Sequence, residues 1–168
     1  MKLLPLFESV GDPSKFGRYL MRVTNGKMYH FTFARYTRSI KKDGLIPRLK
    51  PNSHYEDGCE GVFLSVFPRI SQTNIPMDIA HVYGEWGDLD SPKPRPKGGP
   101  CPVIRVTVDI SQLEPELFGL DDSYAEIERD QDKDTETRLR RSLKFGALCY
   151  QGDIPPSAII EITDKFPF

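Results

Sequence analysis

The apolar residues of this chain occur in short runs, each ending in a polar or aromatic side chain. Three groups stand far apart: residues 29–32 (Tyr-His-Phe-Thr) leading on to 44–47 (Gly-Leu-Ile-Pro), residues 61–65 (Gly-Val-Phe-Leu-Ser), and residues 151–156 (Gln-Gly-Asp-Ile-Pro-Pro). Such strand ends can hold a flat, charged ligand, because one strand supplies hydrogen bonds and another supplies a ring face. The pattern therefore predicts a nucleotide site between strand ends.

Length and composition predict one domain over residues 1–168, because 168 residues and 19.2 kDa suffice for one core but not for two. A charged fraction of 28% and a mean hydropathy of -0.45 favour a solvated exterior. No run approaches the roughly 20 apolar residues of a membrane-spanning helix, and the apolar run at 1–7 is too short for a signal-peptide core. We therefore expect no membrane partner.

The cysteines and histidines indicate neither a disulfide framework nor a metal site. Cys59, Cys101 and Cys149 are odd in number and lack Cys-x-x-Cys spacing. His54 and His81 have no metal-ligand companions at a usable spacing. A reducing, cytoplasmic location and no bound metal are the expectations that follow.

The net charge of -1 conceals an uneven distribution. Residues 1–50 contain eleven Lys and Arg against three Asp and Glu, so they carry +8 (11 minus 3) and the remaining 118 residues carry -9. A basic segment of this kind is typical of a surface that meets phosphate, either of a dinucleotide or of a nucleic acid. A solvated helix face is the alternative interpretation.

Local patterns predict an α+β domain with a mixed sheet and flanking helices. Strands are expected at 27–33, 62–66, 103–110, 147–150 and 158–163. Helices are expected at 14–21, within a basic N-terminal segment 1–26, and at 34–43, 78–86 and 124–145. Residues 88–102 are too rich in proline and glycine for regular structure and are expected to form a loop.

The order of these pieces resembles the ADP-ribosyltransferase fold superfamily. The shared pieces are Tyr-His-x-Thr on a strand, a helix followed by Gly-Leu-x-Pro, Gly-Val-Phe-Leu-Ser on a second strand, a Val-rich strand, and Gly-x-Ile-Pro-Pro-x-x-Ile. The chain looks most like small bacterial and phage members and the related RNA 2′-phosphotransferases, over residues 28–163. The resemblance implies a mixed, split β-sheet with flanking helices and NAD as the cofactor.

On the first strand, the resemblance assigns the NAD ribose to His30 and to Thr32, with Phe31 between them in the binding strand. Arg35 and Arg38 follow directly and suit the pyrophosphate, since guanidinium groups pair bidentately with phosphate oxygens. The alternative for His30 is a half-buried histidine whose hydrogen bonds are satisfied within the fold.

On the second strand, Phe63 takes the place of the ring that stacks on nicotinamide, and Ser65 could reach a ribose or amide oxygen. A plain core role is the alternative for Phe63. The superfamily's catalytic Glu would fall near Ala147, where this chain has none. The resemblance therefore leaves Gln151 and Asp153 as catalytic substitutes beside His30, or else an acid of the preceding helix, Glu126 or Glu128.

Three functions follow from the resemblance. The first is an NAD-dependent ADP-ribosyltransferase, a glycosyl transfer enzyme that attaches ADP-ribose to a macromolecular acceptor, either a protein or a nucleic acid. The second is an RNA 2′-phosphotransferase that uses NAD as the phosphate acceptor. The third is a catalytically inactive module that binds NAD or another nucleotide, which the absence of Glu near position 147 permits.

Overall fold

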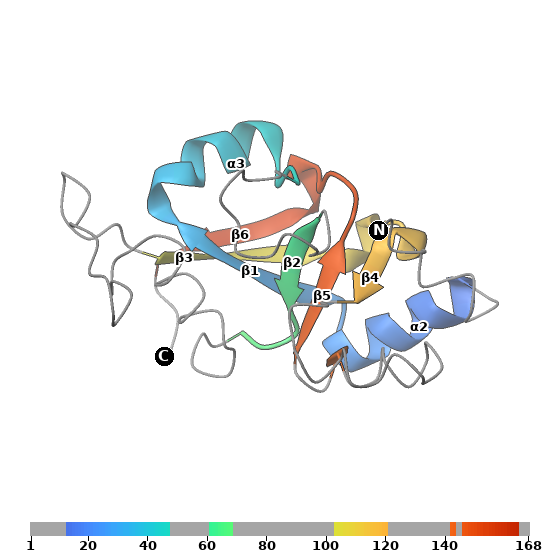
Figure 1. Cartoon of the computed structure of the whole chain (residues 1–168). Coiled ribbons are helices and arrows are strands. Elements are labelled where there is room, and N and C mark those ends of the chain that lie inside the picture. Colours follow the sequence, from blue (N-terminus) through green and yellow to red (C-terminus); the bar gives the residue numbers. More distant parts are fainter. Residues whose placement is uncertain (1–12, 48–60, 69–102, 121–141, 144–145, 165–168) are drawn as a thin grey trace, which may run out of the picture.

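The computed structural model describes residues 13–47, 61–68, 103–120, 142–143 and 146–164 (Figure 1). Within these residues, six strands form one sheet in the order β4-β5-β2-β1-β3-β6, and every neighbouring pair is antiparallel. The strands are β1 Lys27–Phe33, β2 Val62–Ser65, β3 Val103–Asp109, β4 Phe118–Leu120, β5 Ala147–Tyr150 and β6 Ile159–Thr163. The α+β class is confirmed, but the sheet is antiparallel throughout and not mixed.

The helices among the described residues are short. The α-helices are α2 Pro13–Thr24 and α3 Thr37–Asp43, and the 3₁₀ turns are η1 Ala34–Tyr36, η3 Ile110–Gln112, η4 Pro115–Leu117 and η5 Pro156–Ala158. The helix expected at 34–43 thus begins as a 3₁₀ turn, and the one expected at 14–21 is longer. The helices expected at 78–86 and 124–145 and the loop at 88–102 lie outside the described residues, except for residues 142–143, which are helical.

The sheet divides into two halves of three strands that meet at β1 and β2. All seven residues of β1 pair with β3, whereas β1 and β2 share one residue pair, Tyr29 with Ser65. Figure 1 shows β2, β5 and β4 running at a steep angle to β1, β3 and β6. We call this divergence the fork. Because the strands are antiparallel, the fork widens toward Phe33 of β1 and Val62 of β2.

One face of the sheet carries the apolar core. Met28 and Val108 are partners across β1 and β3, Leu64 and Leu148 are partners across β2 and β5, and all four are fully buried. The helices add Phe16 and Leu20 from α2 and Ile40 from α3 to the same core. Helix α3 lies over the β1-β3-β6 half, whereas α2 lies near β4 (Figure 1). The two helices therefore cover different parts of the sheet.

Gly44 ends α3 because the chain must turn there at a positive φ. Its φ is 82°, and its N–H donates to the carbonyl of Ile40 at 2.9 Å. A Cβ at this position would clash with the carbonyl oxygen of Ile154. Leu45 and Ile154 then exchange two backbone hydrogen bonds, at 2.9 and 3.0 Å. The Gly-Leu-x-Pro and Gly-x-Ile-Pro-Pro motifs are therefore in direct contact.

Asp109 caps the turn that follows β3. Its carboxylate accepts hydrogen bonds from the Ser111 hydroxyl at 2.6 Å, the Ser111 backbone N–H at 3.0 Å and the Gln112 amide at 3.2 Å. These bonds, that of the Ser111 hydroxyl foremost, hold the pKa of Asp109 below its ordinary value of 3.8 because they favour the charged form.

The expected effect of Asp109→Asn is a loss of less than about 1 kcal/mol in the free energy of unfolding at neutral pH, since the carboxylate is largely solvated. The folded-state pKa is the lower one, so this stabilisation is present above the unfolded pKa of about 4 and is lost as the pH falls through the folded value. Urea denaturation of both proteins at neutral and acidic pH checks this. A difference that stays constant below that pKa would contradict it.

Candidate functional site

His30 bridges the fork at the point where β1 and β2 separate. Its Nδ1 lies 3.0 Å from the carbonyl oxygen of Phe63, and the side chain is half-buried. Because a carbonyl oxygen only accepts, Nδ1 carries the proton and donates it to this bond. A neutral ring in that tautomer has its acceptor lone pair at Nε2. The contact fixes the orientation of the imidazole and makes Nε2 the atom that could accept from a sugar hydroxyl.

The register assigns His30 and Phe63 to opposite faces of the sheet. Cross-strand partners project to the same face, and successive residues of a strand alternate between faces. Since Tyr29 pairs with Ser65, Phe63 shares the face of Tyr29, and His30 lies on the other face. His30 and Phe63, which the resemblance assigns to the same NAD molecule, therefore do not share a face of the sheet.

The other first-strand residues divide in the same way. Thr32 pairs with Ile104 of β3, shares the face of His30 and is half-buried. Phe31 lies on the opposite face, is 5% exposed and pairs with Arg105. The structure thus brings Thr32 to the face of His30 and leaves Phe31 on that of Phe63.

The two arginines predicted for the pyrophosphate lie just beyond β1. The Arg35 guanidinium stands over two rings of its own chain, 5.0 Å from the centroid of Phe33 and 5.2 Å from that of Tyr36. Arg38 is exposed on α3. Both residues therefore stand at the wide end of the fork.

Ser65 closes β2 through bonds to its own backbone. Its hydroxyl accepts from the N–H of Phe67 at 2.9 Å and donates to the carbonyl of Phe67 at 3.2 Å. The residue is 0% exposed. These two hydrogen bonds explain why a polar residue is buried at the end of β2. They leave its hydroxyl shielded from a ligand, contrary to the expected role.

Gln151 and Asp153, predicted as catalytic partners of His30, do not lie beside it along the sheet. On β5, Leu148 is level with Leu64 and hence with His30, whereas Gln151 is three residues further on. With two strand spacings added, its Cα lies about 14 Å from that of His30 in an ideal sheet. Asp153 is exposed, next to the Ile154 bridge with Leu45. The β5 residue nearest the row of the fork is instead Ala147, which pairs with Ser65.

Sequence reasoning missed a polar cluster on the Tyr29 face. Arg105 donates from Nη2 to Oε2 of Glu161 at 2.9 Å and from Nη1 to the carbonyl of Pro68 at 3.2 Å. The same guanidinium stands 5.3 Å from the Tyr29 ring centroid, and Thr107 Oγ1 lies 3.4 Å from Glu161 Oε2. The alternation Ile-Arg-Val-Thr-Val-Asp over 104–109 carried the signal, because period two indicates one polar face.

The register extends this cluster into a continuous row across five strands. From β6 to β5 the row runs Glu161, Thr107, Tyr29, Ser65 and Ala147. Arg105 holds the Glu161 carboxylate, which is 50% exposed, while its own side chain is 14% exposed. The row crosses the fork at its one shared pair.

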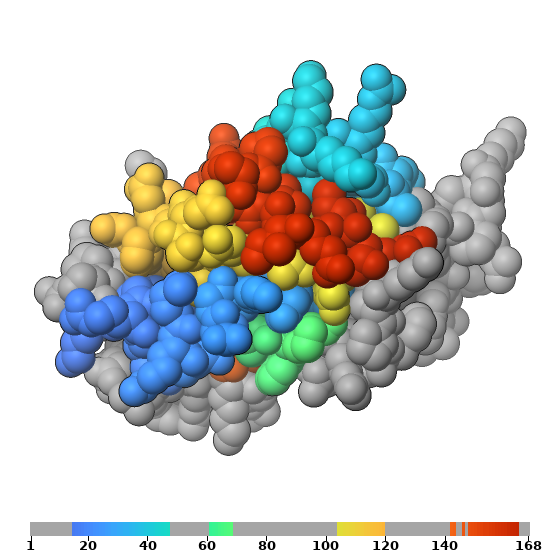
Figure 2. Space-filling view, turned by 180° about the vertical axis from the view of Figure 1, so that it is seen from behind, coloured from blue at the N-terminus to red at the C-terminus, as the bar shows by residue number. Residues whose placement is uncertain are grey.

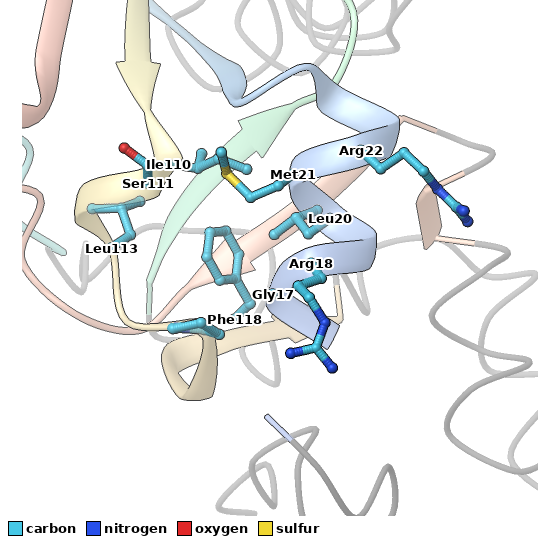
Figure 3. A pocket seen from close by; sticks show the side chains of 10 residues that line it. Gly17, Arg18, Leu20, Met21, Arg22, Ile110, Ser111, Leu113 and Phe118 are labelled. Carbon is cyan, nitrogen blue, oxygen red and sulfur yellow. The ribbon is translucent and has the colours of Figure 1, made fainter. Parts of the chain in front are cut away.

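A separate hollow of about 680 Å³ lies between α2 and the segment from η3 to β4 (Figure 3). Leu20, Leu113 and Phe118 form much of its floor, and the side chains of Arg18 and Arg22 extend outward along α2. None of the residues that the motifs single out line it.

The structure bears on the expectations about disulfides and about metal sites. Cys149 is fully buried and disulfide-bonded, which corrects the expectation that no disulfide forms; Cys59 and Cys101 lie outside the described residues. The described parts of the chain contain no group of three His, Cys, Asp or Glu placed to hold a metal ion.

No helix among the described residues is both long and apolar enough to cross a bilayer. Comparison with models of protein families, with curated proteins and with solved structures found no match for this chain. The resemblance to the ADP-ribosyltransferase superfamily therefore rests on the sequence motifs alone.

Proposed function

We propose that this chain binds NAD at the fork between β1 and β2 and transfers its ADP-ribose to a macromolecular acceptor. One observation carries the proposal: the ladder between these strands consists of a single pair, and the imidazole of His30 bonds across the divergence to Phe63. A split sheet with a histidine on the first strand is what the superfamily resemblance implies. The fork and His30 therefore support the same site.

In this proposal NAD lies in the plane of the fork, since only there can it contact both faces. Nε2 of His30 accepts from a hydroxyl of the nicotinamide ribose, and the Phe63 ring packs against nicotinamide from the other face. The glycosidic bond breaks and nicotinamide leaves with the electron pair. The acceptor nucleophile then bonds to the anomeric carbon and loses its proton to solvent.

Ala147 favours one further candidate, a module that binds NAD without turnover. Positive charge develops at the anomeric carbon as nicotinamide leaves, and a nearby carboxylate would stabilise it. Residue 147 pairs with Ser65 beside the fork, and alanine supplies no charge there. That candidate predicts NAD binding without release of nicotinamide.

Calorimetric titration with NAD, followed by measurement of free nicotinamide, tests the proposal. Binding with nicotinamide release and transfer of label from the adenylate half of NAD onto a macromolecule supports ADP-ribosylation. Binding alone supports the module. Cyclic phosphate on ADP-ribose, formed with 2′-phosphorylated RNA, would assign the phosphotransferase instead. If NAD does not bind and no nicotinamide is released, the proposed site is wrong.

A further inference from the structure

Three cations stand together on the exposed side of α3. Arg38, Lys41 and Lys42 are exposed, while Ile40 of the same helix is buried in the core. Neither Arg38 nor Lys41 has an ion-pair partner among the described residues. Lys42 lies 3.7 Å from Asp43, with the two side chains 81% and 43% exposed. Such an exposed pair is worth little, so this basic α3 face keeps most of its positive charge.

The basic α3 face stands at the wide end of the fork. Phe33, the last residue of β1, leads through η1 directly into α3, and the fork widens toward Phe33. Arg35 of η1 rests on the Phe33 and Tyr36 rings and adds a fourth cation to the same approach. In Figure 2 the α3 segment, in cyan, projects from the surface. A bound polyanion on this face would lie next to the fork.

The cations of α2 differ in position and contacts. Arg22 lies 5.7 Å from the Tyr19 ring, and Arg18 borders the hollow described above. Helix α2 lies near β4, away from α3 (Figure 1). The two helices thus offer similar charge at different places, which makes α2 an internal control for charge alone.

We infer that the acceptor is a nucleic acid and that the basic α3 face binds its phosphates beside the fork; this inference rests on the proposed function. Closely spaced cations match the regular negative charge of a nucleic-acid backbone, and phosphate contacts position the chain without reading its sequence. The chain as a whole has a net charge of -1, so this face does not follow from general basicity.

The transfer replaces one bond at the anomeric carbon of the NAD ribose by another. A nucleophilic oxygen or nitrogen of the nucleotide forms a bond to the anomeric carbon of the ribose. The bond from that carbon to nicotinamide breaks, nicotinamide departs with the electron pair, and the acceptor proton passes to solvent. The α3 face takes no part in this chemistry and acts by positioning the acceptor.

The test uses a triple variant, Arg38→Gln with Lys41→Gln and Lys42→Gln, and a control triple on α2, Lys15→Gln with Arg18→Gln and Arg22→Gln. Fluorescence anisotropy follows labelled single-stranded RNA and DNA of about 20 nucleotides, without NAD, from about 50 to 200 mM salt. We expect the α3 triple to bind at least tenfold more weakly and to lower the salt slope by about 2, because each lost phosphate contact accounts for about 0.7. The control triple should retain most of the affinity.

Equal loss in both triples, no loss in the α3 triple, or tighter binding of a poly-glutamate peptide than of either oligonucleotide would overturn the inference. Circular dichroism verifies that both triples are folded. The assay contains no NAD, so its outcome is separate from that of the proposed function. If oligonucleotide binding depends on α3 but no nicotinamide is released from NAD, only the proposed enzyme activity is contradicted. If nicotinamide is released but oligonucleotide binding does not depend on α3, only this inference is contradicted.

Discussion

Replacing His30 by alanine is expected to weaken NAD binding about 100-fold, which corresponds to about 2.7 kcal/mol. The variant removes the acceptor that the ribose would use and also the 3.0 Å bond to the Phe63 carbonyl that crosses the fork. Loss of one partner from a half-buried hydrogen bond leaves the other unsatisfied, and this adds to the lost ligand contact. Calorimetric titration with NAD measures the change.

Two conservative variants separate the two roles of His30, the bridge to Phe63 and the contact to NAD. Asparagine has an N–H group near the position of Nδ1 but no acceptor at the position of Nε2, so His30→Asn should keep the bridge to Phe63 and still lose most of the NAD affinity. The longer side chain of His30→Gln carries its amide near the position of Nε2, so this variant should lose the bridge to Phe63 and keep most of the NAD affinity. Thermal unfolding of each variant reports the bridge separately from the ligand. Unchanged NAD affinity in His30→Ala would remove the site from the fork.

The strands could be predicted from the sequence because their patterns are local. The sequence predicts β1 and β5 at their observed bounds, and β2, β3 and β6 within one residue. β4 was missed since three residues, Phe-Gly-Leu, carry too little pattern of their own and form a strand by pairing with β5. Sequence patterns thus identify elements that are long enough to show a period.

The relation between His30 and Phe63 could not be predicted, because it depends on register. Which residue of β2 stands opposite Tyr29 is decided by nonlocal pairing, and a shift by one residue would move Phe63 to the face of His30. Motif spacing along the chain contains no information on that choice.

The polar cluster was hidden for a related reason. Arg105 and Glu161 are 56 residues apart, and only the pairing of β3 with β6 brings them together. Their strands were predicted, and the alternation on β3 was visible, but the partner of each polar residue was not. Tyr29 shares this cluster while its neighbour His30 bridges the fork, so two adjacent residues serve different faces.

Residue 147, near which the resemblance would place a catalytic acid, offers a gain-of-function prediction. Ala147→Glu is expected to raise the rate of nicotinamide release about 100-fold, since one preorganised electrostatic contact to a charged transition state contributes about that much. The register places residue 147 opposite Ser65, one strand beyond β2 and in the row that contains the one shared pair of β1 and β2. Single-turnover release of nicotinamide from NAD measures the rate.

Ala147→Gln is the matched control, because it has nearly the same size and hydrogen-bonding reach without the charge. If the carboxylate acts on the positive anomeric carbon, the glutamine variant stays near the wild-type rate. The two variants should also differ in pH dependence, since only the glutamate loses its effect as the pH falls through the carboxyl pKa. Equal rates in both variants, with both folded by circular dichroism, would mean that residue 147 does not adjoin the reacting ribose.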